Sequence, residues 1–226
     1  MPSTLVHVAF ALLCAAGLLG DRFTRRAALA VAAATIIPDL DVFASLVVES
    51  THRAALHNLF VPGVAALALR SRRGQQWLRG RFGPDAVAVA WVALFGYVVA
   101  GLGLDMFTPL GVNPLYSAVD QFVAVDGTVG YSTDGGVFQT FLETGETTNS
   151  DAGGGGTVDI GQRGSTKEVH VASGVDPEPG PESAADERLF PLVQRGWQVT
   201  LLLVGGLVTL ARLRTTHEAG ALSDER

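Results

Sequence analysis

The chain has 226 residues, a formal charge of −6 and 48% hydrophobic residues, and its mean hydropathy of +0.31 is high for a soluble domain. Its acidic balance argues against nucleic-acid binding, which needs a basic surface. Its single cysteine, Cys14, excludes an intramolecular disulfide and a thiolate zinc cluster.

Five apolar segments that carry almost no charge follow one another along the chain. A membrane-spanning helix needs about 20 apolar residues, with roughly 17 as a lower limit. The second and fourth segments reach this length, the first and fifth come close to it, and the third is short enough to be a half-span or a re-entrant helix. We therefore expect an all-α polytopic membrane protein, a bundle of four to five transmembrane helices. The segments are residues 5–20, 27–48, 56–69, 86–104 and 197–211.

Arginines follow the first, third and fifth segments, in residues 22–26, 70–81 and 212–214. Basic loops stay in the cytoplasm. Five crossings would place all three arginine clusters on one side, with the N-terminus outside and the C-terminus in the cytoplasm. This topology predicts a multi-pass protein of the cell membrane in which residue 150 is accessible from outside and residue 75 from inside. A signal peptide is disfavoured because the first basic residue, Arg22, follows the first apolar run instead of preceding it.

A long acidic segment separates the fourth and fifth apolar segments. Between residues 105 and 190 there are fourteen Asp or Glu against three Lys or Arg, an excess typical of a halophilic surface. Residues 153–156 and 176–181 have the glycine and proline content of linkers, and residues 121–125 and 136–143 have the composition of short strands. We expect a partly β or disordered extramembrane insertion. The expected regions are a helical core at 1–111, the acidic insertion at 112–188, a C-terminal transmembrane helix at 189–212 and a cytoplasmic tail at 213–226.

Ionisable side chains lie at the ends of the apolar segments. Such groups are costly in a membrane and usually functional. The topology, which was derived only from arginine positions and segment lengths, places all of them at the outer face. Imidazole nitrogen and carboxylate oxygen without thiolate suit Zn²⁺, Mn²⁺ or Fe²⁺. The residues are His7, Asp39, Asp41, His52, Arg53, His57 and Asp105.

The order of these motifs resembles the LexA-regulated, membrane-bound, metal-dependent hydrolases of bacteria and archaea, over about the first half of the chain. That family looks distantly similar to zinc-dependent phospholipase C and the P1-type nucleases, which implies phosphoester hydrolysis. The matching motifs are His7, Pro38-Asp39-Leu40-Asp41, His52-Arg53-Ala54-Ala55-Leu56-His57-Asn58 and Asp105-Met106-Phe107-Thr108-Pro109-Leu110-Gly111.

With this resemblance in view, we expect a membrane-bound metal-dependent hydrolase that acts on a phosphoester or lipid-linked substrate at the outer face. The ion, expected to be zinc, would be held by four of the residues, and membrane lipid is the expected partner. Asp41 or His52 would orient a ligand or act as general base, and Arg53 would hold an anionic group. The expected metal ligands are His7, Asp39, His57 and Asp105.

The chain departs from the family pattern at Gly101, where the family has a histidine four residues before the aspartate that corresponds to Asp105. On an α-helix the two positions share a face, so Gly101→His is expected to restore a ligand. The departure keeps a rival open, namely a non-catalytic membrane protein whose metal or polar cluster is structural and which displays the acidic insertion. A transporter is less favoured, because its ionisable groups would lie near the midplane of the bilayer.

Overall fold

The structure is a computed structural model that describes residues 3–48, 50–125, 127, 129–133, 136–139, 143–145, 157–159, 161–176 and 190–224. The linker expected at 153–156 lies outside the described residues, and so does the linker expected at 176–181 apart from Asp176.

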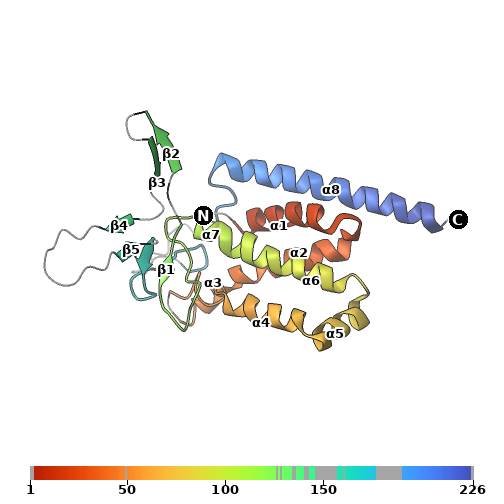
Figure 1. Cartoon of the computed structure of the whole chain (residues 1–226), viewed down its shortest axis with the longest axis horizontal. Coiled ribbons are helices and arrows are strands. Elements are labelled where there is room, and N and C mark those ends of the chain that lie inside the picture. Colours follow the sequence, from red (N-terminus) through yellow and green to blue (C-terminus); the bar gives the residue numbers. More distant parts are fainter. Residues whose placement is uncertain are drawn as a thin grey trace, which may run out of the picture.

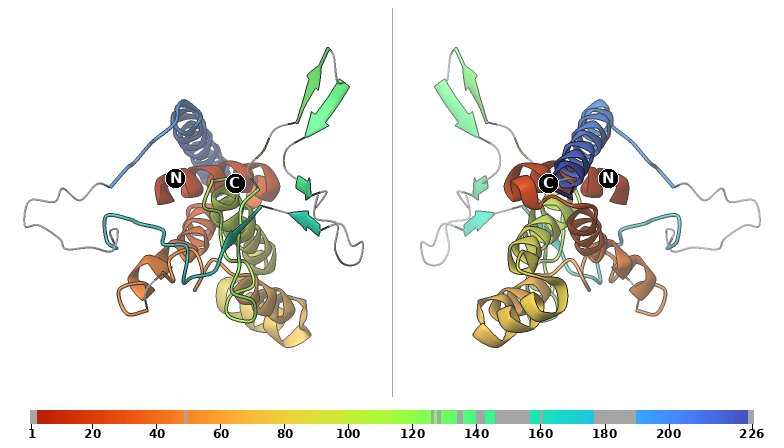
Figure 2. Two further views of the ribbon diagram at one scale, coloured as in Figure 1. Left: turned by 90° about the vertical axis from the view of Figure 1, so that its left-hand side faces the viewer. Right: turned by 90° about the vertical axis from the view of Figure 1, so that its right-hand side faces the viewer.

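The described chain is mostly helical, and its long helices run side by side in a bundle (Figure 1). Seen end-on in Figure 2, α8 lies next to α1, and α4 and α5 lie on the far side of α6. The helical elements are α1 (Thr4–Leu19), η1 (Gly20–Arg22), α2 (Arg25–Ile36), η2 (Pro38–Leu40), α3 (Asp41–Ala44), α4 (Phe60–Arg70), α5 (Arg72–Phe82), α6 (Ala86–Phe95), the π-helix η3 (Gly96–Gly103), α7 (Leu104–Met106) and α8 (Gly196–Asp224).

Three of the described helical stretches are long and apolar enough to cross a membrane: Thr4–Arg22, Ala86–Met106 and Gly196–Thr215. A fourth crossing is counted if α2 and the η2–α3 stretch, which meet at a bend of 44°, form one broken span. The third apolar segment forms only the 11-residue α4, which is about 16 Å long at 1.5 Å per residue and therefore shorter than a bilayer core. Five crossings are not confirmed.

Local sequence explains where the helices begin and end. The Thr24 hydroxyl accepts a hydrogen bond from the Ala27 backbone N–H at 3.2 Å and so caps the start of α2. Ser71 separates α4 from α5 and caps α5 through the Gly74 N–H at 3.0 Å. Pro38 ends α2, as the sequence predicts. After it, Asp39 lies in a 3₁₀ turn and Asp41 opens a single helical turn.

The bundle core consists largely of small side chains, as expected where helices must approach closely without a hydrophobic driving force between them. It includes Ala11, Ala15, Ala27 and Ala93, together with the larger Phe23. Helix α8 packs along α1, where Gly205 lies so close to Ala9 that an added Cβ would stand 2.5 Å from the Ala9 carbonyl oxygen.

The helices alternate in direction, so that the two ends of the bundle differ in character (Figure 1). One end holds the start of α1, the turn after α2, the start of α4, α7 and the start of α8, and the strands lie beyond it. The other end holds η1, α5 and the C-terminus, and with them the three arginine clusters. This separation agrees with the expected topology. Which end faces the cytoplasm stays a prediction.

The described part of the insertion contains three antiparallel strand pairs: β1 (Phe122–Val123) with β6 (Gln162–Gly164), β2 (Val129–Ser132) with β3 (Gly136–Gln139), and β4 (Glu143–Gly145) with β5 (Thr157–Asp159). Strands β1 and β3 lie within the segments where strands are expected, residues 121–125 and 136–143, whereas β2, β5 and β6 lie outside them. A second small core of Ala54, Phe122, Val169 and Val171, with Tyr116 against it, joins the insertion to the loop of residues 51–59. This part of the insertion is therefore packed against the helical body, whereas the β2–β3 hairpin projects from it (Figure 2).

Substitution of Gly205 tests the contact between α1 and α8. Gly205→Ile forces a side chain against the Ala9 backbone, and overpacking of this kind typically costs about 1–3 kcal/mol. The neighbouring Gly206 is the matched control, since it has nothing within 4 Å of an added Cβ. We expect a lower melting temperature in detergent for Gly205→Ile only. Equal melting temperatures for the two variants would mean that α8 does not pack on α1 in this way.

Single-cysteine labelling tests the topology. In a Cys14→Ala background, Lys167→Cys should react with an impermeant maleimide on intact cells, and Gln76→Cys should react only after lysis. Both positions are exposed, and they lie at the insertion end and the arginine-rich end of the bundle. The reverse pattern would invert the topology.

Candidate metal centre

Four of the seven candidate residues bring their side chains together at the insertion end of the bundle. His7 lies in the second turn of α1, Asp39 in η2, His57 in the loop before α4 and Asp105 in α7. The Nδ1 and Nε2 atoms of His7 lie 3.5 Å from Asp39 Oδ2 and 3.5 Å from Asp105 Oδ1. His57 Nε2 lies 3.6 Å from Asp39 Oδ1 and 3.3 Å from Asp105 Oδ2. Imidazoles and carboxylates therefore alternate around one small space.

Three of the four imidazole nitrogens in this cluster are buried without a hydrogen-bond partner among the described residues, although each lies 3.3–3.6 Å from a carboxylate oxygen. This holds for both nitrogens of His7 and for Nε2 of His57, whose side chains are 1% and 0% exposed. Buried polar atoms are normally paired, so orphaned ones call for an explanation. One ligand atom each from His7, Asp39 and Asp105 lies within 4.8 Å of the others. The side chains present, with nitrogen and oxygen donors and no thiolate, therefore fit a divalent ion such as Zn²⁺.

Asp41 fixes the orientation of His57. Its Oδ2 atom accepts a hydrogen bond from His57 Nδ1 at 2.8 Å and another from the Leu56 backbone N–H at 3.3 Å. With Nδ1 engaged in this way, Nε2 is the nitrogen directed at Asp39 and Asp105. A carboxylate behind an imidazole is the usual arrangement around a histidine that binds a metal. Asp41 thus contacts Nδ1 of the His57 ring, and Asp39 lies near Nε2 of the same ring.

Arg53 lies beside the centre and is almost fully buried, at 1% exposure. Its Nη2 donates to Asp105 Oδ1 at 2.6 Å, and its Nη1 donates to Thr108 Oγ1 at 2.7 Å and to the Gly111 carbonyl at 3.2 Å. Its φ of 64° is a left-handed conformation that non-glycine residues rarely adopt. These contacts fix Asp105 on one side and the turn after α7 on the other.

His52 is not brought into the centre. Its Nδ1 donates to the Val171 carbonyl oxygen at 2.9 Å, which ties the loop of residues 51–59 to the insertion. Burial lowers the pKa of His52, although the Asp41 carboxylate acts in the opposite direction. Among the described residues no hydrogen bond or ion pair joins it to His7, Asp39 or Asp105.

Two residues that were not expected support the ligands. The Thr4 hydroxyl donates to Asp39 Oδ2 at 2.5 Å, and the Tyr97 hydroxyl donates to the Leu56 carbonyl in the loop that carries His57. Thr4 precedes His7 by three positions on one helix, so its spacing is a signal that the sequence does contain. Tyr97 has no comparable signal, because its contact joins positions 41 apart.

Gly101 lies in the π-helix η3, not in an α-helix, and packs against the turn that carries Asp39. An added Cβ would stand 3.0 Å from Pro38 Cγ and 3.6 Å from the Thr35 carbonyl oxygen. A histidine at this position would therefore press on Pro38, which is rigid and adjacent to Asp39. The geometry therefore predicts that Gly101→His lowers metal affinity, whereas the sequence predicts that it restores a ligand.

We expect Gly101→Ala, and more strongly Gly101→His, to lower metal affinity by displacing Asp39. Disturbing the support of a ligand typically costs about 10–100-fold in affinity. Gly103→Ala is the matched control in the same helix, because an added Cβ there makes an ordinary contact of 3.5 Å with the Val98 carbonyl. Metal titration of purified protein measures the effect. A gain in affinity for Gly101→His would restore the expectation drawn from the sequence.

Comparison with known proteins identifies a family but no individual relative. No curated protein and no solved structure matches the chain. Residues 1–142 match the profile of a family described as YdjM inner membrane protein. The match contains every residue of the centre and ends within the insertion, before α8. Since it spans more than half of the 226 residues, the chain belongs to the YdjM inner membrane protein family.

Proposed function

We propose that this membrane protein is a metal-dependent hydrolase that acts on a phosphoester or lipid-linked substrate at the outer face of the membrane. The observation that carries the proposal is the buried set of orphaned imidazole nitrogens of His7 and His57, which face the carboxylates of Asp39 and Asp105. Clustered ionisable groups at a membrane are costly and mark function by default.

The chain's own residues divide into ligands and supports. His7, Asp39, His57 and Asp105 would hold the ion, and Asp41 keeps the His57 ring in place. When bound, a divalent ion supplies Lewis acidity and lowers the pKa of water enough to make a nucleophile near neutral pH. Arg53 has a planar guanidinium suited to an anionic oxygen, and its bond to Asp105 places that charge next to the ligands.

A general base is not assigned to His52, because its Nδ1 is engaged by the Val171 carbonyl. Asp41 Oδ1 is the better candidate. It is buried without a hydrogen-bond partner among the described residues, and its other oxygen already accepts from His57.

A structural polar cluster remains the second candidate. Arg53 and Asp105 form an ion pair at 2.6 Å with side chains 1% and 4% exposed, which gives the Asp105 carboxylate a partner other than a metal. Gly101 offers no ligand and packs on Pro38 instead. Against this reading, the Arg53 contacts leave His7 and His57 Nε2 without hydrogen-bond partners.

Metal analysis of purified protein separates the two candidates. Wild type should bind about one divalent ion per chain or more and hydrolyse bis(p-nitrophenyl) phosphate. Asp39→Ala and His57→Ala should lose more than about 100-fold in metal affinity, since each removes a ligand, and even losses of supporting groups cost about 10–100-fold. Asp21→Ala, an exposed acid at the other end of the bundle, is the control. If wild type binds no divalent metal, the structural cluster is the better interpretation.

A further inference from the structure

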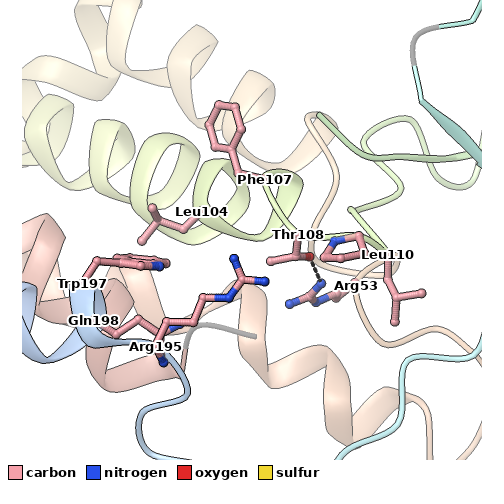
Figure 3. A pocket seen from close by; sticks show the side chains of 9 residues that line it. Arg53, Leu104, Phe107, Thr108, Leu110, Arg195, Trp197 and Gln198 are labelled. Atoms are coloured by element: carbon pink, nitrogen blue, oxygen red, sulfur yellow. Dashed lines mark hydrogen bonds between the residues drawn. The ribbon is translucent and has the colours of Figure 1, made fainter. Parts of the chain in front are cut away.

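A pocket of about 260 Å³ lies between the candidate metal centre and the start of α8 (Figure 3). Arg53 and Thr108 line it on the side of the centre, and Arg195 and Gln198 line it on the side of α8. The lining contains two arginines and no carboxylate. Such a pocket favours an anionic ligand.

Arg53 contributes a buried positive charge to the wall of this pocket. Its two Nη atoms are bonded to Asp105, Thr108 and Gly111, but its buried Nε has no hydrogen-bond partner among the described residues. The Arg53 side chain is 1% exposed and already paired with Asp105, so it acts on a ligand in the pocket through its charge and not through a free N–H group. Because Arg53 also bonds Asp105, an anion here would lie beside the ligands of the centre.

Arg195 supplies the second charge from a well-defined position. The Gln198 side chain is 1% exposed, and its Oε1 accepts from the backbone N–H groups of Gln194 and Arg195 at 2.7 and 3.2 Å. This contact fixes the backbone from which Arg195 projects. Figure 3 shows the guanidinium groups of Arg195 and Arg53 reaching into the same space from the α8 side and from the loop side.

The rest of the pocket wall is apolar and continues into the membrane helices. Leu104 and Phe107 lie at the end of the span Ala86–Met106, and Trp197 lies at the start of the span Gly196–Thr215. Phe107 and Trp197 are 62% and 44% exposed. Aromatic side chains at helix ends mark the level of lipid head groups. A ligand with its charge between the two arginines would therefore have its apolar part beside the hydrocarbon region.

We propose that this pocket binds the phosphate group of a membrane phospholipid, with the phosphate between Arg53 and Arg195 and the acyl chains along Leu104 and Trp197. This inference rests on the proposed function, for which it names the substrate class. It also gives α8, which lies outside the part of the chain that matches the family, a direct role in substrate binding.

Fluorescence quenching tests the pocket without requiring hydrolysis. Trp197 becomes the only tryptophan in a Trp77→Phe, Trp91→Phe background, and phosphatidic acid with brominated acyl chains is added to the full chain in detergent micelles. We expect saturable quenching that Arg195→Gln weakens about tenfold or more. Arg214→Gln, an exposed arginine at the other end of α8, should leave it unchanged. Brominated diacylglycerol, which has the acyl chains but no phosphate, reports non-specific contact, and inorganic phosphate is added as a competitor.

Each outcome has a defined meaning. The proposal is overturned if Arg195→Gln does not weaken the quenching. It is also overturned if brominated diacylglycerol quenches Trp197 equally in every variant. Displacement by inorganic phosphate at concentrations similar to those of the lipid would show a site for free phosphate, which also overturns the lipid assignment. Metal content is measured on the same samples. Arg195-dependent lipid binding in a protein that holds no metal would reject the hydrolase and keep the lipid site. Metal binding together with lipid quenching that does not depend on Arg195 would keep the metal centre and reject the lipid site.

Discussion

Three carboxylates share one buried cluster at the end of a membrane bundle, and their negative charge must be balanced by the groups around them. Asp39, Asp41 and Asp105 have side chains 18%, 0% and 4% exposed, and burying an unpaired carboxylate is among the costliest steps in folding. Arg53 offsets one negative charge. With neutral histidines, two negative charges remain, which is the charge that one divalent ion would balance. Because Arg53 and His57 lie in the loop of residues 51–59, balancing this charge requires that the loop be held at the insertion end of the bundle. Tyr97 and the insertion hold it there.

The helical core and the grouping of the candidate ligands could be predicted from the sequence because both follow from local rules. Apolar length located the helices, and arginine position placed His7, Asp39, His57 and Asp105 at one end before any contact was known. The number of crossings was less predictable. Segment 56–69 has the composition of a membrane helix, but its first four residues belong to the loop that carries His57, so only α4 remains.

The finer geometry could not be predicted because it depends on contacts between distant positions. The space around Gly101 is set by the π-helix and by Pro38, and helical spacing alone does not predict that contact. His52 looks like a ligand in the motif, but its ring is engaged by Val171, which is 119 positions away. The pocket joins residues 53 and 195, and no periodicity in the chain connects them.

The packing of α8 on α1 has a consequence for the order in which the protein is assembled. Gly205 packs against Ala9, so α8 must find α1, which is synthesised well before it. Contacts between positions so far apart form late, because closing the long intervening chain costs entropy. His7, on α1, is synthesised long before Arg195, which directly precedes α8. The pocket is therefore complete only after α8 has been synthesised, and a chain released before α8 would carry the four candidate ligands without the wall of the pocket that α8 provides.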